Sequence, residues 1–309
     1  MGPEVTAPDA VPRRLLLVHA HPDDETITTG GTIARYLAQG TEVTVVTCTL
    51  GDEGEVMEPR FAELTSDNAD QLGGYRIGEL TAALAALSDP AEPVLRPLFL
   101  GGMGRWRDSG MAGTPAAEHP RAFATAVASG RPDGGPVAAL VRILRDRRPQ
   151  VVVTYDEFGG YGHPDHIAAH AVTHAAIEAA AAPSLPGEPW RVAKLYWTVT
   201  ARGDLDAGLD ALRGAELPAD WRVAAADELP AHDDAAVTAR IDVSAVADRK
   251  AAALRAHETQ LAVDPTGAAF ALTNRIAQPV FREEAFVLAR GVAAPGPDGV
   301  ERDLFAGIA

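Results

Sequence analysis

The sequence predicts an α/β fold, with a mainly parallel sheet flanked by helices and a C-terminal extension. Three observations support this prediction. Apolar strand patterns alternate with helical patterns over the first two thirds of the chain, two of the predicted strands lead into motifs rich in histidine and aspartate, and the alternation loosens after about residue 200. Such alternation is typical of parallel strands joined by helices that cover both faces of a sheet, a Rossmann-like arrangement.

The predicted elements follow one another closely. Strands are predicted at 14–20, 43–49, 151–155 and 193–199, with a short apolar run at 95–100; helices are predicted at 25–39, 65–87, 136–147, 164–182 and 246–261. Residues 101–135 are glycine-rich and irregular, and loops of this length are usually functional or disordered. We expect a disordered lead at 1–12 and a single domain at 13–309, with an α/β core at about 13–200 and an extension at about 201–309.

Composition narrows the class of protein. A formal charge of −16 argues against nucleic-acid and anionic-membrane partners, because both need basic surface. No apolar run approaches the roughly 20 residues of a membrane span. Residues 1–11 lack the pattern of a secretory signal, and the lone Cys48 cannot form an internal disulfide. We therefore expect a cytoplasmic protein with a small-molecule partner; the sequence gives no basis for an oligomeric state.

Two short motifs follow predicted strands. Residues 21–25 (HPDDE) come after the strand at 14–20, and residues 162–166 (GHPDH) come after the strand at 151–155. Loops at the carboxyl ends of parallel strands line a shared crevice, and histidines with a carboxylate there suit a metal ion that keeps a position for water. Adjacent aspartates suggest one ligand and one free general base, although spacing alone does not say which is which.

The residues of the two motifs also have structural interpretations. An aspartate after a strand is often a helix N-cap, but a second motif at an equivalent strand-to-helix position favours a metal site. His170 and His174 lie further along the same helix and are interpreted as packing or surface residues. The glycine-rich loop 157–162 would bring Tyr161 and His163 to the site, where a phenol and an imidazole could stabilise an oxyanion or protonate a leaving amine.

The two motifs resemble those of the zinc-dependent N-acetylglucosaminylphosphatidylinositol de-N-acetylase-like family. The resemblance rests on residues 20–25 (AHPDDE) and 162–166. Longer runs at 47–51 (TCTLG), 71–80 (QLGGYRIGEL) and 104–114 (GRWRDSGMAGT) are similar to the branch of that family in mycothiol biosynthesis. The resemblance implies metal-dependent removal of acetate from an N-acetylglucosaminyl-inositol pseudodisaccharide. Zinc is the expected metal, and ferrous iron suits the same ligands.

The resemblance also implies roles for individual residues. Metal ligation is implied for His21, Asp24 and His166, and general-base catalysis for Asp23. Tyr161 and His163 would serve the oxyanion and the leaving group, with Asp165 supporting His163 through a hydrogen bond. Binding of the sugar and inositol hydroxyls is implied for Arg76, Asp108 and Glu55.

The same residues are compatible with three alternative functions. A mycothiol S-conjugate amidase would share the fold, metal and reaction, but residues 26–29 (TITT) and 105–114 favour the deacetylase. A non-haem iron oxygenase also uses two histidines and a carboxylate, but the α/β pattern speaks against it. An inactive sugar-binding module should lack a free base, whereas Asp23 is present. The sequence leaves the role of the C-terminal extension open, and closure over the site by residues 257–260 (HETQ) is one option.

Overall fold

The structure is a computed structural model that describes residues 12–308 except 92, 131–134, 186 and 226. The disordered lead expected at 1–12 therefore lies, apart from residue 12, outside the described residues. Within the described part of the chain, no helix combines the length and the apolar character that crossing a bilayer would require.

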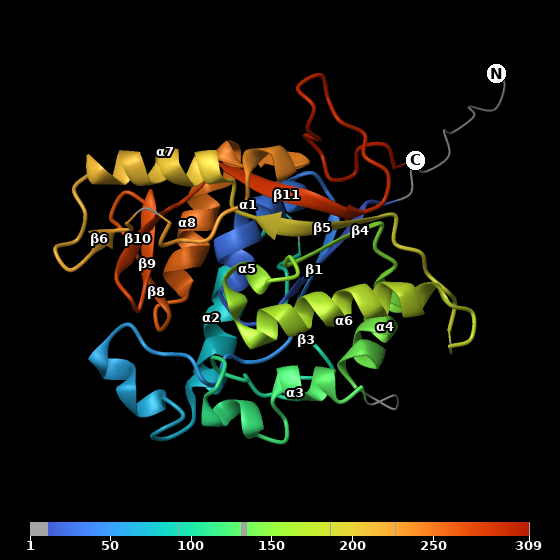
Figure 1. The fold of residues 1–309 in the computed structure, drawn as a ribbon, viewed down its shortest axis with the longest axis horizontal. Helices are drawn as coiled ribbons and strands as arrows, with labels where there is room; N and C mark the ends of the chain where they lie inside the picture. Colours follow the sequence, from blue (N-terminus) through green and yellow to red (C-terminus); the bar gives the residue numbers. More distant parts are fainter. Residues whose placement is uncertain (1–11, 92, 131–134, 186, 226, 309) are drawn as a thin grey trace.

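A twisted sheet forms the centre of the molecule (Figure 1). In spatial order, its strands among the described residues are β3 (Leu98–Phe99), β2 (Glu42–Thr47), β1 (Arg14–His19), β4 (Val151–Thr154), β5 (Lys194–Val199), β11 (Glu283–Arg290) and β7 (Ala239–Asp242). The first five are parallel, and β11 and β7 continue the sheet in antiparallel pairing. The predicted α/β fold with a mainly parallel, helix-flanked sheet is confirmed.

Helices cover both faces of the sheet because its strands are apolar on both sides. Leu15 and Leu17 of β1 pack on one face, against α1 (Asp24–Ala38), α2 (Leu72–Leu87) and α8 (Ala247–Ala256). Leu16 and Val18 point to the other face, against α3 (Phe123–Ala128), α4 (Pro136–Arg147) and α6 (Pro164–Ala181). Successive side chains of a strand alternate between faces, so one continuous apolar run can fill two cores.

The C-terminal hundred residues do more than extend the core. They form α7 (Arg202–Arg213) and a second sheet of β6 (Arg222–Val223), β10 (Ile276–Pro279), β9 (Ala269–Leu272) and β8 (Leu261–Val263), seen beside α7 in Figure 1. They also supply β7 and β11 to the central sheet, so the sheet does not end near residue 200.

Two predicted helices are shorter in the structure. The helix predicted at 65–87 begins at Leu72, because residues 65–70 form turns in which the Asn68 side chain bonds the Ala62 carbonyl and Asp70 has a φ of 53°. The helix predicted at 246–261 ends at Ala256, and β8 begins five residues later. The irregular stretch 101–135 contains α3 and a short 3-10 turn at Pro115–Glu118.

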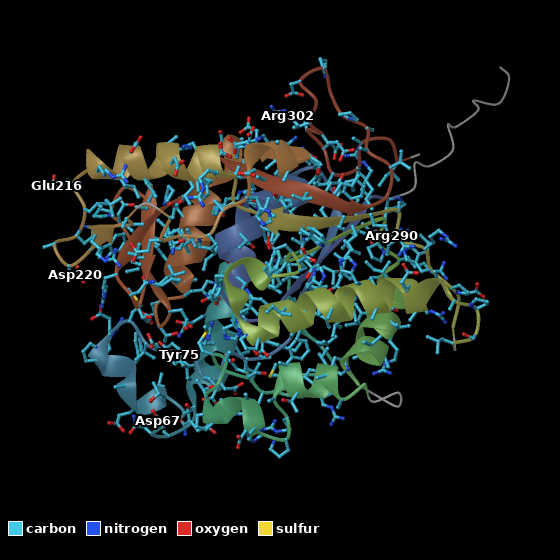
Figure 2. All side chains as sticks on the ribbon, in the orientation of Figure 1. Asp67, Tyr75, Glu216, Asp220, Arg290 and Arg302 are labelled. Carbon is cyan, nitrogen blue, oxygen red and sulfur yellow. The ribbon has the colours of Figure 1, made fainter. Side chains whose placement is uncertain are left out.

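Both lysines of the sequence are buried in ion pairs. Lys194 Nζ lies 2.5 Å from Glu301 Oε1, and Lys250 Nζ lies 2.6 Å from Glu284 Oε1. Glu284 also accepts hydrogen bonds from the backbone N–H groups of Gly31 and Thr32 in α1, at 2.9 and 2.8 Å. The basic side chains of the outer surface are therefore arginines, such as Arg290 and Arg302, which are labelled at the periphery of the molecule in Figure 2.

Replacing Glu284 with alanine should lower the free energy of unfolding by about 3–5 kcal/mol, because it leaves a buried ammonium and two buried N–H groups unpaired. Urea denaturation measures the change. Asp210→Ala is the control, because its pair with Arg213 is exposed and should contribute less than about 1 kcal/mol. Equal effects of the two substitutions would contradict the prediction.

Candidate metal and catalytic site

The two motifs meet because their strands are neighbours. β1 and β4 pair directly and in parallel, with Leu17 beside Val153, so the loops after both strands leave the same edge of the sheet. His21 comes from the loop before α1, and His166 comes from the first turn of α6. Gly159 permits the close approach of the second loop, since a Cβ there would lie 2.6 Å from that of His166.

Three atoms that could ligate a metal ion form a nearly equilateral triangle. His21 Nδ1 and Asp24 Oδ2 are 3.4 Å apart, and His166 Nε2 lies 3.3 Å from each of them. A tetrahedral zinc ion, with bonds of about 2.0–2.1 Å, requires ligand atoms about 3.3–3.5 Å apart. The donor set therefore fits an ion of this size, with the fourth position left for water or substrate. His163 lies in the same cluster as His21 and His166.

Asp24 is the acceptor at the centre of this cluster. Its Oδ2 accepts hydrogen bonds from the backbone N–H of His21 at 2.9 Å and from the hydroxyl of Tyr155 at 2.8 Å. Burial alone would raise the pKa of Asp24, but His166 and His21 hold it well below its usual value. Tyr155 also stacks on the His166 ring at 4.2 Å. Our sequence reasoning missed Tyr155, although a tyrosine ending the strand that precedes the second motif was a usable signal.

The second nitrogen of His21 faces two carboxylates. Its Nε2 is 3.3 Å from Asp165 Oδ2 and 3.5 Å from Asp108 Oδ1. Burial opposes protonation, yet these carboxylates raise the pKa of His21 well above its usual value. A carboxylate on the far nitrogen of a ligating histidine fixes the ring and its tautomer.

Asp165 contacts His163 in a different way from the one expected. Its carboxylate lies on His21 and accepts the backbone N–H of Ser109 at 2.9 Å, whereas its own backbone N–H donates to His163 Nδ1 at 3.1 Å. Because Nδ1 accepts this bond, the hydrogen of the neutral ring is on Nε2. Burial, with His21 and His166 nearby, lowers the pKa of His163 to about 3. His163 is therefore a neutral N–H donor.

Tyr161 lies at the exposed side of the cluster. The residue is 57% exposed, and its ring packs edge-on against that of His166, with the ring centroids 4.9 Å apart. Within the described part of the chain, its hydroxyl makes no hydrogen bond. The loop that carries Tyr161 is shaped by buried Asp156, which accepts the N–H of Gly160 and lies 2.6 Å from His232 Nε2. Asp156 was not singled out from the sequence.

Asp23 has an unusual backbone conformation. Its φ of 111° is costly for a residue with a Cβ, about 1–3 kcal/mol. Its N–H donates to Glu25 Oε2 at 3.0 Å, and its Oδ2 lies 3.2 Å from Arg76 Nη2. Burial raises the pKa of Asp23 to about 6, although Arg76 opposes this shift. A carboxylate with this pKa can accept a proton near neutral pH.

The three residues expected to bind hydroxyls differ in position. Arg76 is buried and donates to the carbonyls of Gly51 and Pro22, while its Nε has no partner among the described residues. Asp108 is buried beside His21. Glu55 is exposed and accepts a hydrogen bond from the Thr273 hydroxyl, so its carboxylate is bonded away from the histidine cluster.

Residues 257–260 lie against the start of α1 and against α2. His257 Nε2 is 3.1 Å from Glu25 Oε1, and the Thr259 hydroxyl donates to Glu79 at 2.7 Å. His170 and His174 instead contact the Tyr155 carbonyl and the Trp197 indole, outside the triangle.

With this fold and site, the chain belongs to the PIG-L (GlcNAc-PI de-N-acetylase) family, whose sequence model matches residues 16–177. A relative from Tsukamurella paurometabola, named 1D-myo-inositol 2-acetamido-2-deoxy-alpha-D-glucopyranoside deacetylase, is 73% identical over 96% of this chain and 99% of its own. A relative of the same name from Nocardia farcinica is 60% identical, covering 95% and 96%. These relatives do not favour the alternative functions. A solved structure of a conserved Thermus thermophilus protein shares the fold, with a TM-score of 0.51 and 23% identity over 92% of this chain and 97% of that one.

Tyr155→Phe should weaken metal binding by about 10- to 100-fold, because it removes the hydroxyl that orients Asp24. Competition with a chromophoric chelator measures the affinity. Tyr36→Phe is a matched control, since the Tyr36 hydroxyl bonds Asp303 instead and its loss should leave metal affinity unchanged. An unaltered affinity in Tyr155→Phe would show that the hydroxyl does not support the site.

Proposed function

We propose that this chain hydrolyses the N-acetyl group of 1D-myo-inositol 2-acetamido-2-deoxy-α-D-glucopyranoside, releasing acetate and the free amine in mycothiol biosynthesis. The observation that carries the proposal is the 73% identity, over nearly the whole chain, to a relative of that name. The triangle of donor atoms supports a metal-dependent hydrolase. A cytoplasmic location is proposed with it, as is a single domain at 13–309, because β7 and β11 complete the central sheet.

The proposed metal ligands are His21 Nδ1, Asp24 Oδ2 and His166 Nε2, whose spacing suits Zn²⁺ and also Fe²⁺. An ion bound there would act as a Lewis acid toward the acetamide carbonyl and lower the pKa of a water molecule toward about 7.

The residues around the triangle would carry out the proton transfers and stabilise the oxyanion. Asp23 accepts the proton of the attacking water as the C–O bond forms. His163 Nε2–H and the hydroxyl of Tyr161 donate hydrogen bonds to the carbonyl oxygen as it becomes negative. The C–N bond breaks as Asp23 returns its proton to the leaving amine. His163, with its lowered pKa, is better suited to donating a hydrogen bond than to supplying a proton.

Substrate hydroxyls are proposed to meet Arg76, Asp108 and Glu55. Arg76 is fixed by its bonds to the Gly51 and Pro22 carbonyls and lies beside the Asp23 carboxylate, so a hydroxyl bound there would lie next to the proposed base. Glu55 would contact the part of the pseudodisaccharide nearest to solvent.

The proposed function predicts chelator-sensitive release of acetate from the pseudodisaccharide, with a mycothiol S-conjugate cleaved much more slowly. Acetate and free amine are quantified for both substrates, with and without a metal chelator. Restoration of turnover by added Zn²⁺ or Fe²⁺ identifies the competent metals. Faster cleavage of the conjugate would show that the protein is an amidase and not the deacetylase. Turnover that survives complete metal removal would contradict the metal-dependent mechanism.

Asp23→Asn should lower kcat by about 10²- to 10⁴-fold while metal content is retained, because the amide cannot accept the proton. Steady-state kinetics and metal analysis on the same preparation measure both. Asp67→Asn, at an exposed position labelled in Figure 2, should leave both unchanged. A metal-loaded Asp23→Asn protein with nearly normal kcat would remove Asp23 from its role as base.

A further inference from the structure

A buried chain of hydrogen bonds links the C-terminal region to Asp23. His257 Nε2 lies 3.1 Å from Glu25 Oε1, and Glu25 Oε2 accepts the backbone N–H of Asp23 at 3.0 Å. We propose that His257 is a positioning residue, which acts through Glu25 to hold the backbone of Asp23 in the conformation that presents its carboxylate. The inference rests on the proposed role of Asp23 as the base.

The conformation of Asp23 needs to be held. A φ of 111° is one that a residue with a Cβ rarely adopts and keeps only where its surroundings fix it. The carbonyl of Asp23 accepts the N–H groups of Thr26 and Ile27 at 2.9 Å each, as the first bonds of α1. The carboxylate of Glu25 fixes the N–H on the other side of the residue. Loss of that acceptor would let the peptide before Asp23 rotate.

Glu25 depends on His257 in turn. Its side chain is fully buried, and a buried carboxylate is stable only when its oxygens are bonded. The Thr26 hydroxyl donates to Oε1 at 2.5 Å, and His257 approaches the same oxygen. Nδ1 of His257 has no hydrogen-bond partner among the described residues. The polar contacts of the ring within them are therefore made by Nε2, to Glu25 and to the Thr26 hydroxyl.

His257 is itself anchored to the element that carries the other partner of Asp23. Two residues on, Thr259 donates its N–H and its hydroxyl to Glu79 at 2.8 and 2.7 Å. Glu79 lies on α2, one turn after Arg76, which contacts the Asp23 carboxylate. The segment 257–260 thus connects the backbone partner of Asp23 with its side-chain partner.

Two amide variants of the full chain test the inference. A glutamine at 257 can place its side-chain N–H near the position of His Nε2, whereas an asparagine is too short to reach Glu25. His257→Asn should lower kcat on the order of 10- to 100-fold with little change in KM, and His257→Gln should recover most of the loss. The same His257→Asn change in an Asp23→Asn protein should have no further effect on kcat, because it acts through Asp23.

Amide hydrogen exchange provides a readout that does not depend on the substrate. Exchange at Asp23 should become at least about 10-fold faster in His257→Asn and stay near normal in His257→Gln. His174→Asn, which changes a histidine bonded to Trp197, should alter neither exchange at Asp23 nor kcat. Thr26→Val removes the other bond to Glu25 Oε1, so it should speed exchange at Asp23 and lower kcat. This variant replaces the His257 variants if they do not fold.

The possible outcomes separate the two proposals. Unchanged exchange at Asp23 in His257→Asn, or an equal fall in kcat with and without the Asp23→Asn change, would overturn the positioning role. A wild-type protein that fails to release acetate from the pseudodisaccharide would overturn the proposed function, while the exchange measurement still decides whether His257 holds Asp23.

Discussion

One carboxylate oxygen, Oδ2 of Asp24, is the atom on which the site depends. It accepts two hydrogen bonds, from the His21 backbone and the Tyr155 hydroxyl, and it lies within 3.4 Å of two imidazole nitrogens. A negative charge on this buried oxygen is tolerated because each of these contacts offsets part of the cost of burying it. The pairing of β1 with β4 brings the two histidines to this oxygen.

The surroundings of the triangle follow from the same need to balance charge in a buried space. Asp165 and Asp108 face the second nitrogen of His21, and Arg76 faces Asp23. Arginine suits the last position because its planar fork can bond two backbone carbonyls and a carboxylate together, which the single ammonium of a lysine would do less well. Each charged group therefore has a partner fixed by another segment, and the geometry does not depend on one loop alone.

The sequence predicted those parts of the fold and site that are local in the chain. Apolar runs such as 14–20 predicted the parallel strands, and the HPDDE and GHPDH motifs predicted which histidines would meet at their ends. β11 was not predicted, although it contains the apolar run 285–289 (AFVLA), because the alternation of strand and helix patterns that marked the parallel strands is lost after about residue 200. The contact of Asp165 with His21 joins residues 144 positions apart, and only the packing of α6 decides that its carboxylate turns toward His21.

The C-terminal region belongs to the site because it holds α1 at two places. α1 begins at Asp24, and its first turn bonds His257 through Glu25. One to two turns later, Glu284 of β11 binds the N–H groups of Gly31 and Thr32, and its partner Lys250 lies on α8, the helix that leads directly into His257. The buried Lys250–Glu284 pair therefore fixes α8 and α1 relative to each other. Because His257 directly follows α8, its position relative to α1 is fixed as well. Residues 21–25 are thus in contact with a segment more than 230 positions away in the chain.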